Sequence, residues 1–245
     1  MDLRSRRAIL CDLDGCLIAG DRLLPGAAAF LAAHGDRLWI VSNNSTDTPA
    51  TLSTRLAGMG LAVDAGRILL AGTCALDWIA ARWPGAAVEI HGSDAIRAHA
   101  AGLGLRLDAA TRSGTGIVLL TRDTGLTYAS LSRLVARLVS GTRLVVANPD
   151  FSHPGPDGAP VPETGALLQA VLSCRPGLAH DTIGKPEPIL LQAALVRAGA
   201  AAAEAVLIGD NPATDGEGAR RLGIPFIRVD SAAGLAPLLE RRLAG

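Results

Sequence analysis

Four short segments of this sequence combine carboxylates, amides, a hydroxyl and an ammonium, and each lies at or near the end of an apolar run. Apolar runs of this kind predict buried strands of a parallel sheet, and the carboxyl ends of such strands face one crevice, where ligands bind. We therefore expect the four segments to converge on one site. They are Asp12-Leu13-Asp14-Gly15, Ser42-Asn43-Asn44, Gly184-Lys185-Pro186-Glu187-Pro188, and Gly209-Asp210-Asn211-Pro212-Ala213-Thr214-Asp215.

The chemistry that these groups suit best is phosphoryl transfer, where catalysis rests on positioning and charge stabilisation. Carboxylates repel a phosphate dianion unless a hard cation lies between them, and Mg²⁺ accepts one or two carboxylates together with a phosphate oxygen. Asp12 can then be both a metal ligand and the nucleophile, giving an acyl phosphate that water cleaves. Asp14, two residues on, can protonate the leaving oxygen as a general acid. Gly15 would let the backbone turn tightly around the phosphate.

The second and third segments offer groups that bind a phosphate. Ser42, Asn43 and Asn44 supply a hydroxyl and amides, and Lys185 supplies a compact positive charge. Of the 23 basic residues, Lys185 is the only lysine and the others are arginines, which suggests a tight anion site that a planar guanidinium would not fit. Each segment alone is an ordinary turn or helix cap. Their combination, in this order and near strand ends, predicts the site.

The elements that must hold these segments alternate between strands and helices, which predicts an α/β fold with a parallel sheet. The predicted strands are 9–11, 38–41, 68–70, 87–90, 116–120, 143–146, 205–208 and 224–229, and the predicted helices are 27–34, 49–58, 74–82, 128–139 and 188–198. A Pro- and Gly-rich stretch from Asn148 to Pro162 predicts an irregular loop.

The bulk composition excludes several classes of function. Acidic and basic residues balance at 23 each, so no net field favours nucleic acid or an anionic membrane. No apolar run reaches the roughly 18 residues that a bilayer span needs, and the first residues lack a signal-peptide cleavage pattern. We therefore expect a cytoplasmic protein. Its four cysteines lack CxxC spacing, and we interpret them as reduced thiols.

The four segments resemble the motifs of the haloacid dehalogenase-like superfamily, from about Ile9 to Val229. The resemblance implies Asp12 as nucleophile, Asp14 as acid/base, and Ser42 and Lys185 as phosphate ligands. It also implies that Asp210 completes the Mg²⁺ site, that Asp14 contributes its backbone carbonyl, and that Asn211 and Asp215 support the site. Cys16 stands where members more often have Thr or Val; packing is its default interpretation, and oxidant sensitivity is the weaker hypothesis.

The spacing of the motifs indicates which subfamily the chain resembles. Only one crossover fits between Asp12 and Ser42, whereas about 100 residues beyond the usual crossovers separate Ser42 from Lys185. That is similar to the type IIA arrangement, as is Asn148-Pro149-Asp150 followed by Gly165. We therefore expect a Rossmann-like, doubly wound parallel-sheet core of residues 1–80 and 179–245, with an inserted α/β cap of residues 81–178.

The resemblance implies a phosphatase of a small soluble ester: a sugar or polyol phosphate, phosphoglycolate, pyridoxal phosphate or a nucleotide monophosphate. The 3% aromatic content offers few stacking platforms and favours the first two. Asp14 argues against a dehalogenase, which needs no acid for its leaving group. A phosphonatase would need a lysine in the cap, and the predicted cap has none. An ion-pumping ATPase would need membrane spans, which the sequence lacks. A phosphomutase and a non-catalytic binding protein remain open. Relatives with this cap often pair through it, so a homodimer is an expectation.

Overall fold

The computed structural model describes residues 3–107, 116–154 and 159–240. The chain divides into two compact units. Unit 1 contains residues 1–42, 49–69 and 184–245, and unit 2 contains residues 43–48 and 70–183. The predicted domain boundaries at 80/81 and 178/179 stay a prediction.

Unit 1 is built on a five-stranded sheet of order β13-β12-β1-β4-β5. The β1–β12, β1–β4 and β12–β13 pairs are parallel, with Ile9 opposite Val206 on one side and Leu38 on the other. Central parallel strands are covered on both faces, which explains why β1 and β12 are continuous buried apolar runs. The chain order reverses between β1 and β12, where ligands bind in such sheets. The strands are β1 (Ala8–Cys11), β4 (Leu38–Ser42), β5 (Ile68–Leu70), β12 (Ala205–Gly209) and β13 (Phe226–Arg228).

Helices and short turns connect these strands. Pro188 opens α7, where its missing N–H is not needed, and Gly199 ends it in the left-handed conformation. The helices are α1 (Ala27–His34), α2 (Pro49–Gly58), α7 (Pro188–Ala198), α8 (Glu217–Leu222) and α9 (Ala236–Glu240). A small hairpin, β2 (Ile18–Ala19) with β3 (Arg22–Leu23), follows the first motif. The remaining turns are 3₁₀ at Ala65–Arg67 and Ala202–Glu204 and π-helical at Pro212–Gly216.

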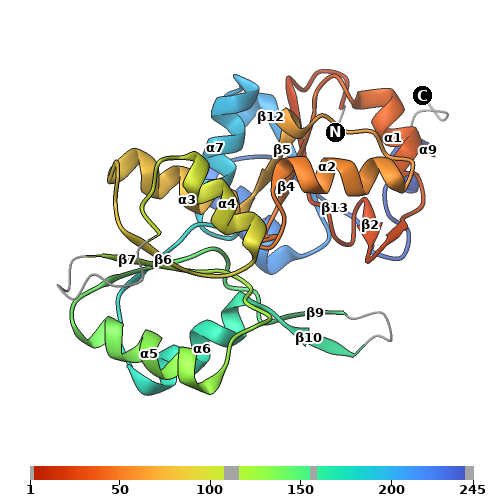
Figure 1. Cartoon of the computed structure of the whole chain (residues 1–245). Coiled ribbons are helices and arrows are strands. Elements are labelled where there is room, and N and C mark those ends of the chain that lie inside the picture. The colour runs from red at the N-terminus through yellow and green to blue at the C-terminus, as the bar shows by residue number, and fades with distance from the viewer. Residues whose placement is uncertain (1–2, 108–115, 155–158, 241–245) are drawn as a thin grey trace. The chain divides into compact units, whose positions relative to one another are not determined.

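Unit 2 has its own four-stranded parallel sheet, of order β11-β8-β7-β6. Helices α5 and α6 lie on one face of this sheet, and α3 and α4 on the other (Figure 1). The core formed by α5, α6 and the sheet includes Val118, Leu134, Leu138 and Val171. The elements are β6 (Val88–His91), β7 (Ile117–Leu120), β8 (Arg143–Val146), β11 (His180–Thr182), α3 (Ala71–Arg82), α4 (Asp94–Gly102), α5 (Tyr128–Val139) and α6 (Thr164–Cys174).

The predicted α/β class and parallel core are confirmed, but one local prediction is wrong. The stretch predicted as an irregular loop carries an antiparallel ladder of β9 (Ser152–Pro154) and β10 (Pro160–Pro162), with His153 opposite Val161. Pro154, Pro160 and Pro162 lie at the ends of the two short strands, where a missing N–H is tolerated. The predicted loop residues 155–158 lie outside the described residues. No helix of the described ranges has both the length and the apolar character needed to cross a bilayer.

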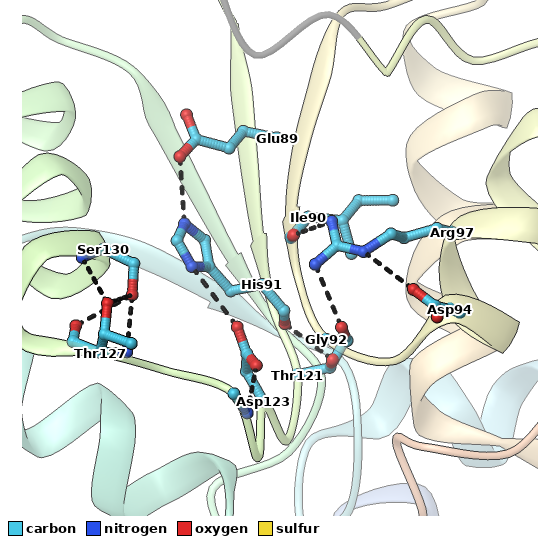
Figure 2. A network of polar contacts seen from close by, with 11 residues as sticks. Glu89, Ile90, His91, Gly92, Asp94, Arg97, Thr121, Asp123, Thr127 and Ser130 are labelled. Carbon is cyan, nitrogen blue, oxygen red and sulfur yellow. Dashed lines mark hydrogen bonds and ion pairs between the residues drawn. The ribbon is translucent and has the colours of Figure 1, made fainter.

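A polar cluster lies at the carboxyl end of β6, within unit 2. Figure 2 shows the buried His91 ring between Glu89 and Asp123, with Nε2 3.1 Å from Glu89 Oε1 and Nδ1 3.8 Å from Asp123 Oδ2. Arg137 Nε lies 3.2 Å from the other Glu89 oxygen. The hydrogen bond with His91 holds the pKa of Glu89 below its ordinary value, against the effect of partial burial, and the charges of His91 and Arg137 add to it.

This cluster predicts an acid-sensitive contribution to stability. Because the pKa of Glu89 is lower in the folded state, its stabilisation is present above the unfolded value of about 4.3 and is lost as pH falls through the folded value. Glu89→Gln should lower the melting temperature at pH 7 by about 2–4 °C, as expected for about 1 kcal/mol. The difference from wild type should shrink below about pH 4. Thermal unfolding followed by circular dichroism checks this from pH 7 down to about 3.5, just below the reference pKa of a glutamate. A melting-temperature difference between the variant and the wild type that stays constant over this range contradicts it.

Candidate active site

The predicted nucleophile lies directly beyond the central strand of unit 1. Asp12 follows Cys11, the last residue of β1, and its backbone N–H donates to Ile208 O of β12 at 2.9 Å. Only 9% of Asp12 is exposed. The strand pairing on both sides of β1 therefore fixes the position from which this carboxylate projects.

A fully buried ammonium joins three segments of unit 1. Lys185 Nζ lies 2.7 Å from Asp12 Oδ1 and 2.7 Å from Asp215 Oδ1, and it donates to Val41 O at 2.9 Å. Lys185 is 1% exposed and Asp215 is 0% exposed. An ammonium has three hydrogens to donate, and these three acceptors match them. Lys185 thus holds one oxygen of Asp12 and ties it to the ends of β4 and β12.

Asp215 reaches the ammonium because of the backbone at the end of β12. It lies in the π-helical turn Pro212–Gly216, and its second oxygen accepts from Asn211 N at 3.2 Å. A Cβ on Gly209 would stand 2.3 Å from the Asp215 carboxyl carbon, closer than real contacts allow. Gly209 is therefore required for this approach. The structure gives Asn211 a second local contact, since its side chain accepts from Ala213 N at 2.9 Å.

Asp210 and Asp12 come together beside Cys16. Carboxylate oxygens of both residues and Cys16 Sγ lie within 4.8 Å of one another. Gly15 makes room for this arrangement: its φ is +77°, and a Cβ there would stand 2.1 Å from Asp210 Oδ2. A left-handed backbone with no space for a side chain favours glycine. The predicted role of Gly15 in a tight turn thus gains a specific neighbour, the Asp210 carboxylate.

The site carries more negative than positive side-chain charge. Asp12, Asp210 and Asp215 face one ammonium, which leaves two negative charges in excess when all are ionised. Burial raises the pKa of Asp12 well above its ordinary value, against the opposing charge of Lys185. Burial, followed by the charge of Asp215, raises the pKa of Asp210. Burial disfavours a charged Lys185, but the charges of Asp12 and Asp215 raise its pKa overall, so it stays an ammonium.

This donor set fits a divalent cation. Asp12 and Asp210 are adjacent carboxylates whose ionised forms are disfavoured where they lie, and a cation between them would relieve both. Hard cations such as Mg²⁺ take oxygen ligands of this kind. Cys16 is fully buried, and a hydrogen bond with Cys11, followed by burial, raises the pKa of its thiol. We interpret Cys16 as a neutral packing residue beside the site.

The structure places the other predicted residues as follows. Asp14 is exposed and Gly15 half-buried just beyond Asp12, and the buried Ser42 is the last residue of β4. Asn43 and Asn44 belong to unit 2. Asn43 Nδ2 donates to Asp150 Oδ2 at 3.0 Å, and Asn44 Oδ1 accepts from Asp47 N at 2.9 Å. The amide side chains of both asparagines therefore have structural partners within unit 2.

Sequence patterns missed the contacts of Val41 O and Gly209. A carbonyl carries no residue-type signal, so Val41 could not have been singled out. The glycine does carry one, because Gly209 directly precedes Asp210 at a strand end, and a glycine there often marks a close backbone approach.

Comparisons with known proteins found related families and related phosphatases. The family described as haloacid dehalogenase-like hydrolase matches residues 9–106, and the one described as HAD-hydrolase-like matches residues 182–242. The chain is 29% identical over 227 residues to the dihydroxyacetone phosphatase of Corynebacterium glutamicum, covering 91% of this chain and 80% of that protein. It is 29% identical over 235 residues to the acid sugar phosphatase of Staphylococcus epidermidis, covering 94% and 88%.

A solved structure is similar over nearly all of this chain. The glycerol phosphate phosphatase of Mycobacterium tuberculosis, in complex with calcium, superimposes with a TM-score of 0.84 at 26% identity. The match covers 93% of this chain and 65% of that one. The same protein is also solved in complex with magnesium.

The buried ammonium predicts a stability effect. Lys185→Met leaves Asp12 and Asp215 buried without their cation, so the free energy of unfolding should fall by about 3–5 kcal/mol. Lys185→Arg keeps the charge but brings a wide planar fork, and it should not restore stability. Adding Asp215→Asn to Lys185→Met should recover part of the loss, because one uncompensated charge is removed.

Urea unfolding followed by circular dichroism measures these differences. Arg133→Met is the matched control, because it removes an exposed cation from α5 and should cost less than about 0.5 kcal/mol. If Lys185→Met is as stable as this control, the buried ion pair does not hold the segments of unit 1 together.

Proposed function

Because this chain belongs to the haloacid dehalogenase-like superfamily, in its type IIA capped subfamily, we propose that it is a magnesium-dependent phosphomonoesterase that works through an aspartyl-phosphate. The chain is a phosphatase of small phosphate esters; the metal, the intermediate and the residue roles are the proposal. The observation that carries it is the Lys185 ammonium, held at 2.7 Å from both Asp12 and Asp215.

Asp12 performs the first step of the proposed reaction. Lys185 holds Oδ1, which fixes the rotation of the carboxylate and directs its other oxygen. Attack on phosphorus forms a bond between the Asp12 carboxylate and the phosphoryl group and breaks the ester bond. Asp14 gives its proton to the leaving oxygen, so that an alcohol departs. Lys185 screens the repulsion between Asp12 and the phosphate.

Asp14 reverses its role in the second step. As a carboxylate it takes a proton from the attacking water, which forms a new oxygen–phosphorus bond as the acyl phosphate breaks. Inorganic phosphate leaves and Asp12 is free again. The exposure of Asp14 suits a group that must meet both the leaving oxygen and the water.

The residues that would hold the magnesium ion are Asp12, Asp210 and the backbone carbonyl of Asp14. The ion would neutralise the excess negative charge of the carboxylates and of the phosphoryl oxygens. Ser42 and Lys185, with Asn43 and Asn44, would bind the phosphate, and Gly15, Asn211 and Asp215 would support them.

The proposed substrates are phosphates of small sugars and polyols. Support comes from the names of the relatives, which are a dihydroxyacetone phosphatase, an acid sugar phosphatase and a glycerol phosphate phosphatase, and from the 3% aromatic content of this chain. Residues 81–178 as a cap domain, and a homodimer formed through that cap, remain part of the proposal.

Phosphate release from a panel of monoesters tests the proposal. The panel holds dihydroxyacetone phosphate, glycerol 3-phosphate, hexose phosphates, phosphoglycolate, pyridoxal phosphate, nucleoside monophosphates and p-nitrophenyl phosphate, each in Mg²⁺ and in EDTA. Release should need Mg²⁺, and Asp12→Asn should retain less than about 10⁻³ of the wild-type rate. Trapping the phosphorylated chain by rapid acid quench and mass spectrometry should place the label on Asp12.

Asp36→Asn is the matched control, because it makes the same change at a carboxylate whose side chain is 74% exposed. It should keep the wild-type rate. An active Asp12→Asn variant would show that another residue is the nucleophile, and full activity in EDTA would remove the metal from the mechanism.

A further inference from the structure

The segment that follows the predicted phosphate ligand Ser42 is held by hydrogen bonds from distant parts of unit 2. Asn148 Nδ2 donates to Asn43 O at 2.7 Å, and Asn43 Nδ2 donates to Asp150 Oδ2 at 3.0 Å. Further along, Gly72 N donates to Asn44 O at 3.2 Å. Residues more than 100 positions away along the chain thus hold both the backbone and the side chain of Asn43.

Ser45 is fixed from two sides. Its hydroxyl lies 3.1 Å from the Thr164 hydroxyl and accepts from Arg122 N at 3.0 Å. Asn148 Nδ2, which donates to Asn43 O, also donates to Thr164 Oγ1 at 3.2 Å. Asn148 and Thr164 therefore form one connected pair that binds Asn43 and Ser45 together.

This connected pair is closed to solvent. Asn148 is 1% exposed, Thr164 0% and Ser45 2%. A buried donor that loses its acceptor cannot turn to water, so each broken contact carries its desolvation cost. The conformation of the Asn43–Ser45 backbone consequently depends on this set of partners.

The support behind Asn148 is itself rigid. Asn148 Oδ1 accepts from Asp150 N at 3.1 Å, which closes a tight turn, and Gly165 N donates to Asp150 O at 2.7 Å. A Cβ on Gly165 would stand 2.2 Å from Pro149 O. The turn thus rests against the first residues of α6, at a distance that only glycine allows.

We propose that Asn148 and Thr164 are positioning residues that hold the peptide after Ser42 in its phosphate-binding conformation. This inference rests on the proposed function, in which Ser42 and Asn43 bind the substrate phosphate. A displacement of about 1 Å at such a group can cost on the order of 100-fold in rate. Inorganic phosphate, the reaction product, should report the same displacement through its binding constant.

Asn148→Asp is the sharpest variant. It keeps the size of the side chain and its acceptor oxygen, but it replaces the donor that faces Asn43 O and Thr164 Oγ1 with a second oxygen. Thr164→Val removes the hydroxyl at nearly constant volume, and the conservative variant Thr164→Ser keeps it. We expect Asn148→Asp and Thr164→Val to raise the inhibition constant of inorganic phosphate by about 10- to 100-fold. Thr164→Ser should raise it much less.

Two further readouts separate positioning from general damage. The Mg²⁺ concentration for half-maximal activity should change less than about threefold, because the proposed metal ligands lie in unit 1, outside this network. Leu138→Ala is the destabilised control: it opens a cavity in the core of unit 2, away from the network. It should lower the melting temperature as much as Asn148→Asp does and leave the phosphate constant unchanged.

The experiment measures competitive inhibition by inorganic phosphate of p-nitrophenyl phosphate hydrolysis, with calorimetric titration of phosphate into the wild type. An active wild type with an unchanged phosphate constant in Asn148→Asp and Thr164→Val overturns this inference alone. A Leu138→Ala variant that binds inorganic phosphate as weakly as Asn148→Asp does also overturns it. A wild type that neither turns over nor binds phosphate overturns the proposed function and this inference with it.

Discussion

The site in unit 1 depends on one ammonium placed between two carboxylates. Lys185 reaches Asp12 at the end of β1, Asp215 beyond β12 and the carbonyl of Val41 in β4. Each charge is buried at a cost that only the others offset. An arrangement of this kind tolerates little displacement, and so it demands the close approach of Asp215 to Gly209. The geometry of the Asp12 carboxylate follows from charge balance as much as from packing.

Much of the fold could be predicted from the sequence, because parallel strands buried on both faces are continuous apolar runs. The runs before Asp12 and Asp210 are of this kind, and they placed both carboxylates at strand ends. Two helices of unit 2, α4 and α6, were missed. Among the residues of α4 only Ile96 and Ala100 are buried, so its apolar pattern is weak, and α6 begins directly after the Pro-rich stretch that predicted a loop.

The contacts that hold the candidate site together were harder to predict than its members. The unique lysine and the four motifs identified which residue types gather there. Nothing local in the sequence indicates that the side chain of Asn43 meets Asp150, or that Asn148 meets Thr164. Such pairs join segments that are close only after the sheet of unit 2 has formed, and an amide side chain looks the same in a ligand site and in a structural one. Asn43 and Asn44 as phosphate ligands stay a prediction; their side chains have partners in unit 2, and the backbone of Asn43 is the group proposed to meet the phosphate.

The order of the strands in unit 1 has a consequence for synthesis on the ribosome. β1 is made first, yet its neighbour β12 and the Lys185 partner of Asp12 lie 173 to 197 positions later. Unit 2, apart from residues 43–48, is continuous from 70 to 183 and can complete its sheet while that neighbour is still missing. The nascent chain must therefore carry an apolar strand with an open edge. Only after the first 185 of the 245 residues have been made can the carboxylate beyond that strand acquire its cation.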